Sequence, residues 1–150
     1  MTTSYNAANA YSSVEMETGV SHADPHKLIL MLFEGAILAV SNAIMHFDRK
    51  EIAEKGASIS HAISIIDSGL NASIDLNSGG EIAQNLSSLY QYMSNRLLLS
   101  NLNNDRAGME EVRKLLIELK GAWEEIGKKE GIASDSPAPE NRASISYGQF

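Results

Sequence analysis

The distribution of proline constrains the fold of this chain more than any other feature. The 150 residues include only three prolines, and none lies between Pro25 and Pro137. Proline disrupts both helix interiors and central strands, so its absence alone does not separate the two. The same interval has few clusters of β-branched residues, which favours helix over sheet. We therefore predict an all-α protein.

The dipeptide Asp24-Pro25 is typical of a helix start. An aspartate at the N-cap accepts a hydrogen bond from a free backbone N–H, and proline at the first helical position loses no bond there. Apolar residues are then dense from His26 to about Phe47 and occupy more than one face of the predicted helix. A helix of this kind must be covered on nearly all sides.

Three further helices are predicted from apolar residues that recur every three or four positions. They span about residues 51–76, 81–100 and 106–129, separated by turn-forming residues at 77–80 and a polar run at 101–105. Four helices of roughly 20 residues with short connections must fold back on one another. The sequence therefore predicts an antiparallel up-down-up-down four-helix bundle.

We expect the bundle domain to occupy residues 24–130, with two different flanks. Residues 1–23 are polar and small but contain several apolar anchors, which indicates a partly ordered segment that packs on or caps a binding groove. Residues 131–150 are rich in Ser, Ala and Pro and show no periodicity. We expect this tail to be disordered.

Composition excludes several classes of function. Lys and Arg number 12 against 19 Asp and Glu, a net charge of −7, which is a poor basis for nucleic-acid binding. There is no cysteine, so disulfides and thiol chemistry are excluded. The apolar stretch Leu28–Val40 is interrupted by Glu34 and is shorter than the roughly 18 residues of a membrane span. We expect a cytoplasmic protein without membrane insertion.

No motif indicates an active site. His22, Asp24 and His26 form an H-x-D-x-H string that could ligate a metal, but we expect Asp24 to cap the helix and both histidines to be exposed. We expect His46 and His61 to face solvent without partners. No Glu-x-x-His pair, phosphate-binding loop or nucleophile elbow occurs. We predict no enzyme, no metal and no cofactor. Metal analysis tests the remaining enzyme hypothesis, which rests on the histidine string.

The chain has more apolar residues than a small bundle core needs, which is roughly three positions in seven. Leu98 and Leu99 continue the third helix's apolar run past its core positions, and Leu115 does the same on the fourth. We expect these three side chains to be exposed contacts for a partner, because apolar patches on soluble proteins usually mark binding sites. An amphipathic helix lying in a groove would cover them. The alternative is that the surplus apolar residues are part of an enlarged core and bind no partner.

Several segments resemble the FliS family of flagellin-specific export chaperones, and together they cover about residues 5–128. They are Ala10-Tyr11 with Val14, Pro25–Ile29, Met31–Ala36, Ala62–Leu70, Gly79–Ala83, Asn85-Leu86, Leu89–Met93, Arg96–Leu102, Glu110–Val112 and Ala122-Trp123. One departure is Asp24, where the family more often has Ser or Thr, which are equally good N-caps.

The resemblance implies an all-helical antiparallel bundle and a chaperone function. Members of the family bind the C-terminal segment of flagellin in the cytoplasm and prevent its polymerisation before type III export. The N-terminal tyrosine region contacts the partner, which implies a binding role for Tyr11 and Val14, and we add Tyr5. Some relatives also engage the anti-sigma factor or an assembly regulator, and the sequence leaves such a second partner open.

A different class of function also fits the apolar surplus. The chain could be a homodimeric structural or regulatory bundle in which each copy hides the same patch of the other. Sedimentation distinguishes the two hypotheses, because a tight dimer with no free apolar groove favours the homodimer.

Overall fold

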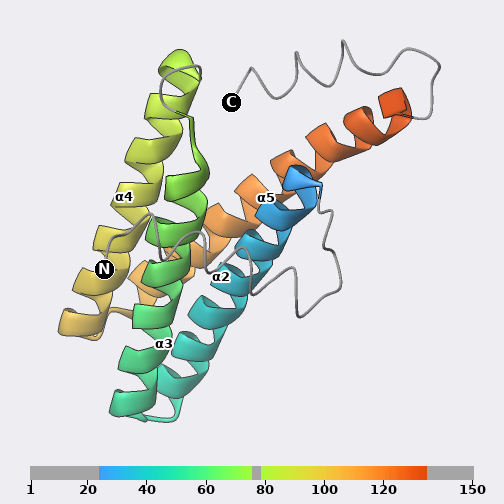
Figure 1. Ribbon diagram of the computed structural model, residues 1–150. Helices are drawn as coiled ribbons and strands as arrows, with labels where there is room; N and C mark the ends of the chain where they lie inside the picture. Colours follow the sequence, from blue (N-terminus) through green and yellow to red (C-terminus); the bar gives the residue numbers. More distant parts are fainter. Residues whose placement is uncertain (1–23, 76–78, 135–150) are drawn as a thin grey trace.

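The computed structural model describes residues 24–75 and 79–134, and the structural statements below concern these residues. They form α2 (Pro25–Asp48), α3 (Ile52–Ser64), α4 (Gly80–Asn103) and α5 (Arg106–Ser134), with a π-helical segment η1 (Ile65–Leu70) and a 3-10 turn η2 (Asn71–Ser73) that continue α3. No strand occurs in this part of the chain. The all-α, four-helix prediction is confirmed (Figure 1).

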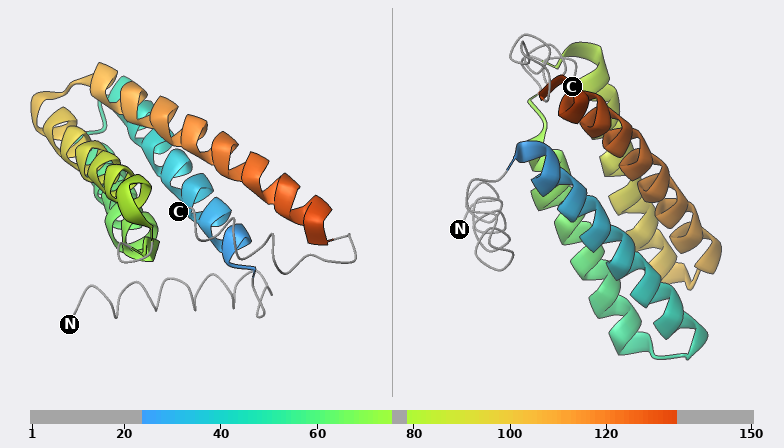
Figure 2. Two further views of the ribbon diagram at one scale, coloured as in Figure 1. Left: turned by 90° about the horizontal axis from the view of Figure 1, so that it is seen from above. Right: turned by 90° about the vertical axis from the view of Figure 1, so that its right-hand side faces the viewer.

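Helix α2 is the central element of the bundle. It packs against α3 on one side and α5 on the other, and α4 contacts both α3 and α5 at the opposite corner. Successive helices run in alternating directions (Figure 1). From its first turns, α5 leans progressively away from α4, so that α2 and α5 diverge from the α3–α4 pair toward one end of the bundle (Figures 1 and 2).

The start of α2 matches the sequence prediction. The Asp24 carboxylate accepts a hydrogen bond from the backbone N–H of His26 at 3.0 Å, and Pro25 is the first helical residue. Local chemistry alone determines this boundary, because cap and proline both act on the first turn.

The core is apolar and draws on all four helices. Helix α2 contributes three fully or nearly fully buried alanines, whose small side chains let neighbouring helices approach closely. The other buried apolar residues are Leu32, Phe33, Val40, Ile44, Ile59, Ala62, Ile66, Leu70, Tyr90, Met93, Leu97, Met109, Val112 and Leu116, with Ala83 near the start of α4.

The length and composition of α2 would also allow it to cross a membrane. The length argument against a membrane span applies to the stretch Leu28–Val40 and not to the whole of α2. Eight residues of α2 are buried inside the bundle. Packing against both α3 and α5 accounts for part of this apolar composition, while Leu38 and Met45 remain exposed.

The second predicted helix ends earlier and less regularly than expected. It was predicted to continue to about residue 76, but the α-helix gives way to η1 at Ile65 and the chain is extended at Ile74. Ile66 and Leu70 are both fully buried, so η1 keeps its inner face in the core. Gly69 lets η1 pack closely against α2, because a Cβ at this position would lie 3.0 Å from a methyl of Leu32.

The C-terminal boundary of the bundle also differs from the prediction. Helix α5 continues to Ser134, four residues beyond the expected limit at residue 130. The remainder of the predicted tail, residues 135–150, and the predicted N-terminal segment, residues 1–23, lie outside the described residues.

Candidate functional site

An exposed apolar row lies near the C-terminal end of α4. Leu98, Leu99 and Leu102 are 48, 43 and 68% exposed. Leu102 is four residues after Leu98 and three after Leu99, so it neighbours both and the three side chains share the outer face of α4. We call them the α4 row. The expected exposure of Leu98 and Leu99 is confirmed, whereas Leu102 was not singled out, although its spacing from Leu98 was a usable signal.

The third expected contact, Leu115, is less exposed than predicted. It is half-buried and packs against the core from α5. Leu119, Leu86 and Leu89 are half-buried in the same way. We call these four residues the α4–α5 strip, because they lie on the two helices that diverge toward one end of the bundle (Figure 2).

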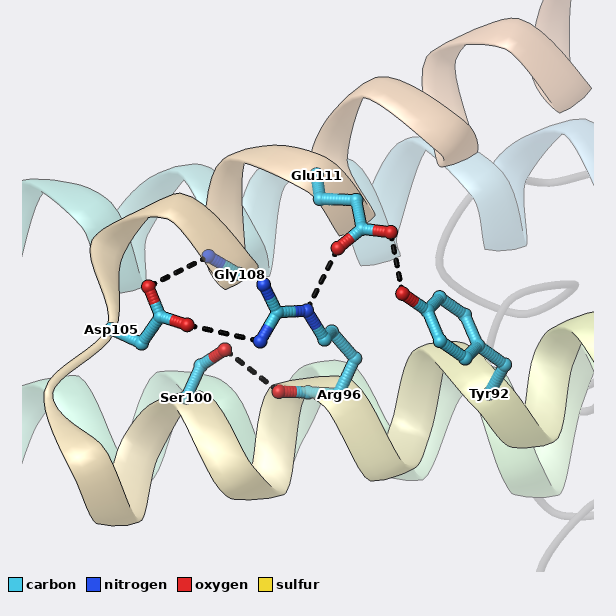
Figure 3. Close-up of polar contacts among 6 residues, drawn as sticks. All are labelled: Tyr92, Arg96, Ser100, Asp105, Gly108 and Glu111. Carbon is cyan, nitrogen blue, oxygen red and sulfur yellow. Dashed lines mark hydrogen bonds and ion pairs between the residues drawn. The ribbon is translucent and has the colours of Figure 1, made fainter.

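A polar network joins α4 to α5 between the α4 row and the α4–α5 strip (Figure 3). The Tyr92 hydroxyl donates to Glu111 over 2.5 Å, and Nε of Arg96 donates to the other oxygen of the same carboxylate over 2.7 Å. Arg96 also donates to Asp105 over 2.9 Å. We call these four residues the clasp. Its members come from different elements, and the periodic apolar pattern of the sequence does not reveal that they meet.

The clasp perturbs the acid–base behaviour of its members. The hydrogen bond from Arg96, followed by that from Tyr92, lowers the pKa of Glu111. Donation to this carboxylate raises the pKa of Tyr92. Both directions follow from the charge of Glu111, because the carboxylate form is stabilised by its donors and the phenolate form is opposed by the nearby charge.

A buried lysine holds the C-terminal end of α4. Lys55 of α3 is only 3% exposed, and its ammonium donates to the backbone oxygen of Asn101 at 3.2 Å and to the side chain of Asn104. The same group lies 5.9 Å from the centre of the Phe47 ring. A cation at a helix C-terminus is favourable, and it ties α3 to the turn between α4 and α5.

The candidate metal string does not have the exposed arrangement that was expected. His26 is buried at 6% exposure and stacks on Trp123 of α5, so its predicted exposure is wrong. Its burial depends on Gly127, where a Cβ would lie 2.1 Å from the imidazole. His22 lies outside the described residues. Within them, no group of three His, Cys, Asp or Glu residues could hold a metal ion.

The two other histidines differ from each other. His61 is exposed, as expected. His46 was expected to lack a partner, but its Nδ1 lies 2.6 Å from the carboxylate of Glu51. The pair closes the turn from α2 to α3, a contact that depends on the turn's geometry and not on helix periodicity.

Other apolar side chains are exposed away from α4. Leu38 is 61% exposed on α2, and Met45 follows it by seven residues on the same face. These positions provide a comparison for the α4 row, because they are equally apolar but lie on another helix. The remaining predicted contacts, Tyr5, Tyr11 and Val14, lie outside the described residues.

Comparisons with known proteins identify relatives over most of the chain. The family model described as “Flagellar protein FliS” matches residues 7–130. The flagellar secretion chaperone FliS of Salmonella typhimurium is 48% identical over 120 residues, covering 80% of this chain and 89% of that protein. FliSB of Pseudomonas aeruginosa is 42% identical over 120 residues, covering 80% and 94%. FliS of Escherichia coli is 40% identical over 116 residues, covering 77% and 85%.

Proposed function

Because the chain belongs to the FliS family of flagellar secretion chaperones, we propose that it binds the C-terminal segment of flagellin in the cytoplasm. By occupying that segment, it prevents premature polymerisation and keeps the subunit competent for type III export. The family is one of chaperones and not of enzymes, and we propose no catalytic role.

The observation that carries this proposal is the α4 row. Three neighbouring leucines are each more than two-fifths exposed on one face of one helix. Burying such side chains against a partner is favourable by about 25 cal/mol per Å² of apolar surface. An amphipathic segment can bury these leucines against its own apolar face, and this contact needs no charged residue.

The N-terminal residues complete the proposed contact. Tyr11 and Val14 are the positions that match the family's partner-binding region, and Tyr5 is added as a second aromatic anchor. A tyrosine combines a large apolar ring with a polar end, which suits a contact that forms and is released. We propose Leu115 as a contact at the edge of the site, since it is half-buried and not fully exposed.

Apolar contact is expected to dominate the binding energy. The chain carries a net charge of −7, and the α4 row itself contains no charged residue. Screening by salt acts on charge pairs and not on apolar burial. We therefore expect the affinity to change by less than about 3-fold between low and moderate salt concentration.

Calorimetric titration with the last 50 or so residues of the organism's own flagellin tests the proposal. We expect one-to-one binding with a large negative heat-capacity change, because apolar burial is coupled to ordering of the segment. The double variant Leu98→Ser/Leu99→Ser is expected to bind about 10-fold more weakly or worse. Leu38→Ser is the control, since it removes a leucine of α2 that is even more exposed, at 61%, and its affinity is expected to be unchanged.

Two results would contradict the proposal. The first is absence of heat at two temperatures, with circular dichroism showing a folded helical protein. If sedimentation then gives the mass of two chains, the homodimeric bundle becomes the better hypothesis. The second is equal binding by wild type and by the Leu98→Ser/Leu99→Ser variant, which would remove the α4 row from the site.

A further inference from the structure

The first three turns of α4 lack the features that hold the start of α2. The N-cap position of α4 is Gly79, which has no side chain to form a capping hydrogen bond, and Gly80 has a φ of +61°. The first backbone bond, from Ala83 N to Gly79 O, is long at 3.4 Å. Glycine is a slightly weaker N-cap than Ser, Asp or Asn, because it has no side chain to accept a hydrogen bond from the first turn.

Burial differs between two parts of α4, which we call its first half (Gly80–Leu89) and its second half (Tyr90–Asn103). Between Gly80 and Leu89 the only fully buried residues are the small Ala83 and Ser87, and the two leucines of this stretch are half-buried. The remainder of the helix buries Tyr90, Met93 and Leu97. Because burial of large apolar side chains is the main stabilising contribution, the first half is the more weakly held.

Side-chain bonds follow the same division. Among the described residues, the first half has one side-chain hydrogen bond to another segment, from Ser87 Oγ to Asn71 Oδ1 at 2.8 Å. The second half is tied to α5 through the clasp and to α3 through Lys55. It also approaches α5 so closely that a Cβ on Gly108 would lie 1.9 Å from the Ser100 hydroxyl.

The first half of α4 carries two residues of the α4–α5 strip, Leu86 and Leu89, and α5 carries the other two, Leu115 and Leu119. Leu89 is seven residues before Arg96, and Leu115 is four residues after Glu111, so both extend the faces joined by the clasp. Beyond the clasp, α5 leans away from α4 (Figures 1 and 2). Leu86, Leu89, Leu115 and Leu119 are accordingly half-buried and not enclosed.

We propose that Gly80–Leu89 form an arm that opens locally while the rest of the bundle stays folded, and that the opening gives the partner segment access to the α4–α5 strip. The clasp marks the limit of the opening, because Arg96 there bonds two carboxylates and Lys55 holds the end of the helix at two oxygens. The opening itself depends only on this chain. The partner segment is the amphipathic C-terminal segment of flagellin, and this identification rests on the proposed function.

Hydrogen exchange on the full-length protein tests the opening. We expect arm amides to exchange at least about 100-fold faster than those of Ala36–Ile44 in α2, after correction for intrinsic rates. The variant Gln84→Gly/Ser88→Gly changes two exposed positions in the arm, and glycine lowers helix stability at such sites. Its arm amides are expected to exchange about 5-fold faster than in wild type. Asn95→Gly, at an exposed position in the second half of α4, is the matched control and leaves arm exchange unchanged.

Titration of the same variants with the flagellin segment tests the coupling. If the segment needs an open arm, Gln84→Gly/Ser88→Gly binds about 5-fold more tightly than wild type, because the competent state is more populated. Asn95→Gly binds as wild type does. Equal exchange in the arm and in α2 would overturn the opening, and unchanged or weaker binding by the arm variant would overturn the coupling. Absence of binding by wild type would instead refute the proposed function and leave the exchange result standing.

Discussion

His26 and Trp123 hold each other through two hydrogen bonds of opposite direction. The indole N–H of Trp123 donates to the backbone oxygen of His26 at 2.9 Å, and Nε2 of His26 lies 2.6 Å from the backbone oxygen of Trp123. Nε2 is the donor in the second bond, because a carbonyl only accepts. The two rings are stacked with their centres 4.9 Å apart. This reciprocal pair fastens the start of α2 to α5.

Replacing Trp123 with Phe is expected to remove one of these bonds and keep most of the ring contact. The backbone oxygen of His26 then loses its indole donor in a partly buried setting. The free energy of unfolding should fall by about 1–2 kcal/mol, measured by urea denaturation. A change smaller than about 0.3 kcal/mol would show that the indole bond does not stabilise the fold.

Gly127→Ala is expected to separate the same two helices by steric conflict. An added Cβ would lie 2.1 Å from Cε1 of His26, so the imidazole must move away from Trp123. We expect a loss of about 1–3 kcal/mol in the free energy of unfolding. Gly121→Ala on the same helix is the control. Its Cβ would meet nothing within 4 Å, so this substitution should stabilise the protein by up to about 1 kcal/mol.

Lys55→Met is expected to destabilise the bundle although methionine is the more apolar residue. The substitution leaves the backbone oxygen of Asn101 and the side chain of Asn104 without their buried donor. We expect a loss of about 1–3 kcal/mol on urea denaturation. Lys114→Met, at an exposed position on α5, should change the free energy of unfolding by less than about 0.5 kcal/mol. Similar effects of both substitutions would refute the anchoring role of Lys55.

Stability is expected to fall in acid partly because Glu111 takes up a proton. The folded pKa of Glu111 is lowered from its ordinary value of 4.5. Its contribution to the free energy of unfolding is therefore fully present above pH 4.5 and is lost as pH falls through the lowered folded pKa. The carboxylate is 40% exposed, and solvent screening limits the contribution to about 1 kcal/mol at most. Glu111→Gln should therefore be less stable than wild type at pH 7, and the difference should shrink as pH falls below 4.5 and through the lowered folded pKa. A difference that is constant with pH would contradict this linkage.

The sequence predicted those features that depend on neighbouring residues. The cap of α2 follows from Asp24 and Pro25 alone, and the exposure of Leu98 and Leu99 follows from their excess over one helical face. The change to a π-helix at Ile65 was not predictable in the same way, because spacings of three and four residues fit both helix types.

Features that depend on distant residues were mispredicted or missed. His26 is buried because Gly127, about a hundred residues later, leaves room for its ring. Lys55 is buried because the turn after α4 supplies two oxygens to its ammonium. Leu115 is half-buried because it lies on the side of α5 that packs against the core. In each case the exposure is determined by how two helices cross, and a periodic pattern specifies a face but not the crossing.

Tyr11→Ala is expected to weaken binding of the flagellin segment without changing the stability of the bundle. If the tyrosine ring is an anchor, its removal costs about 1–3 kcal/mol of binding free energy, or roughly 5- to 150-fold in affinity. Titration calorimetry gives this value, and urea denaturation of the free protein gives the stability. Because the N-terminal residues precede the described helices, a loss of affinity with unchanged stability identifies a partner contact. Unchanged affinity would remove Tyr11 from the binding site, and a parallel loss of stability would assign it to packing within the chain.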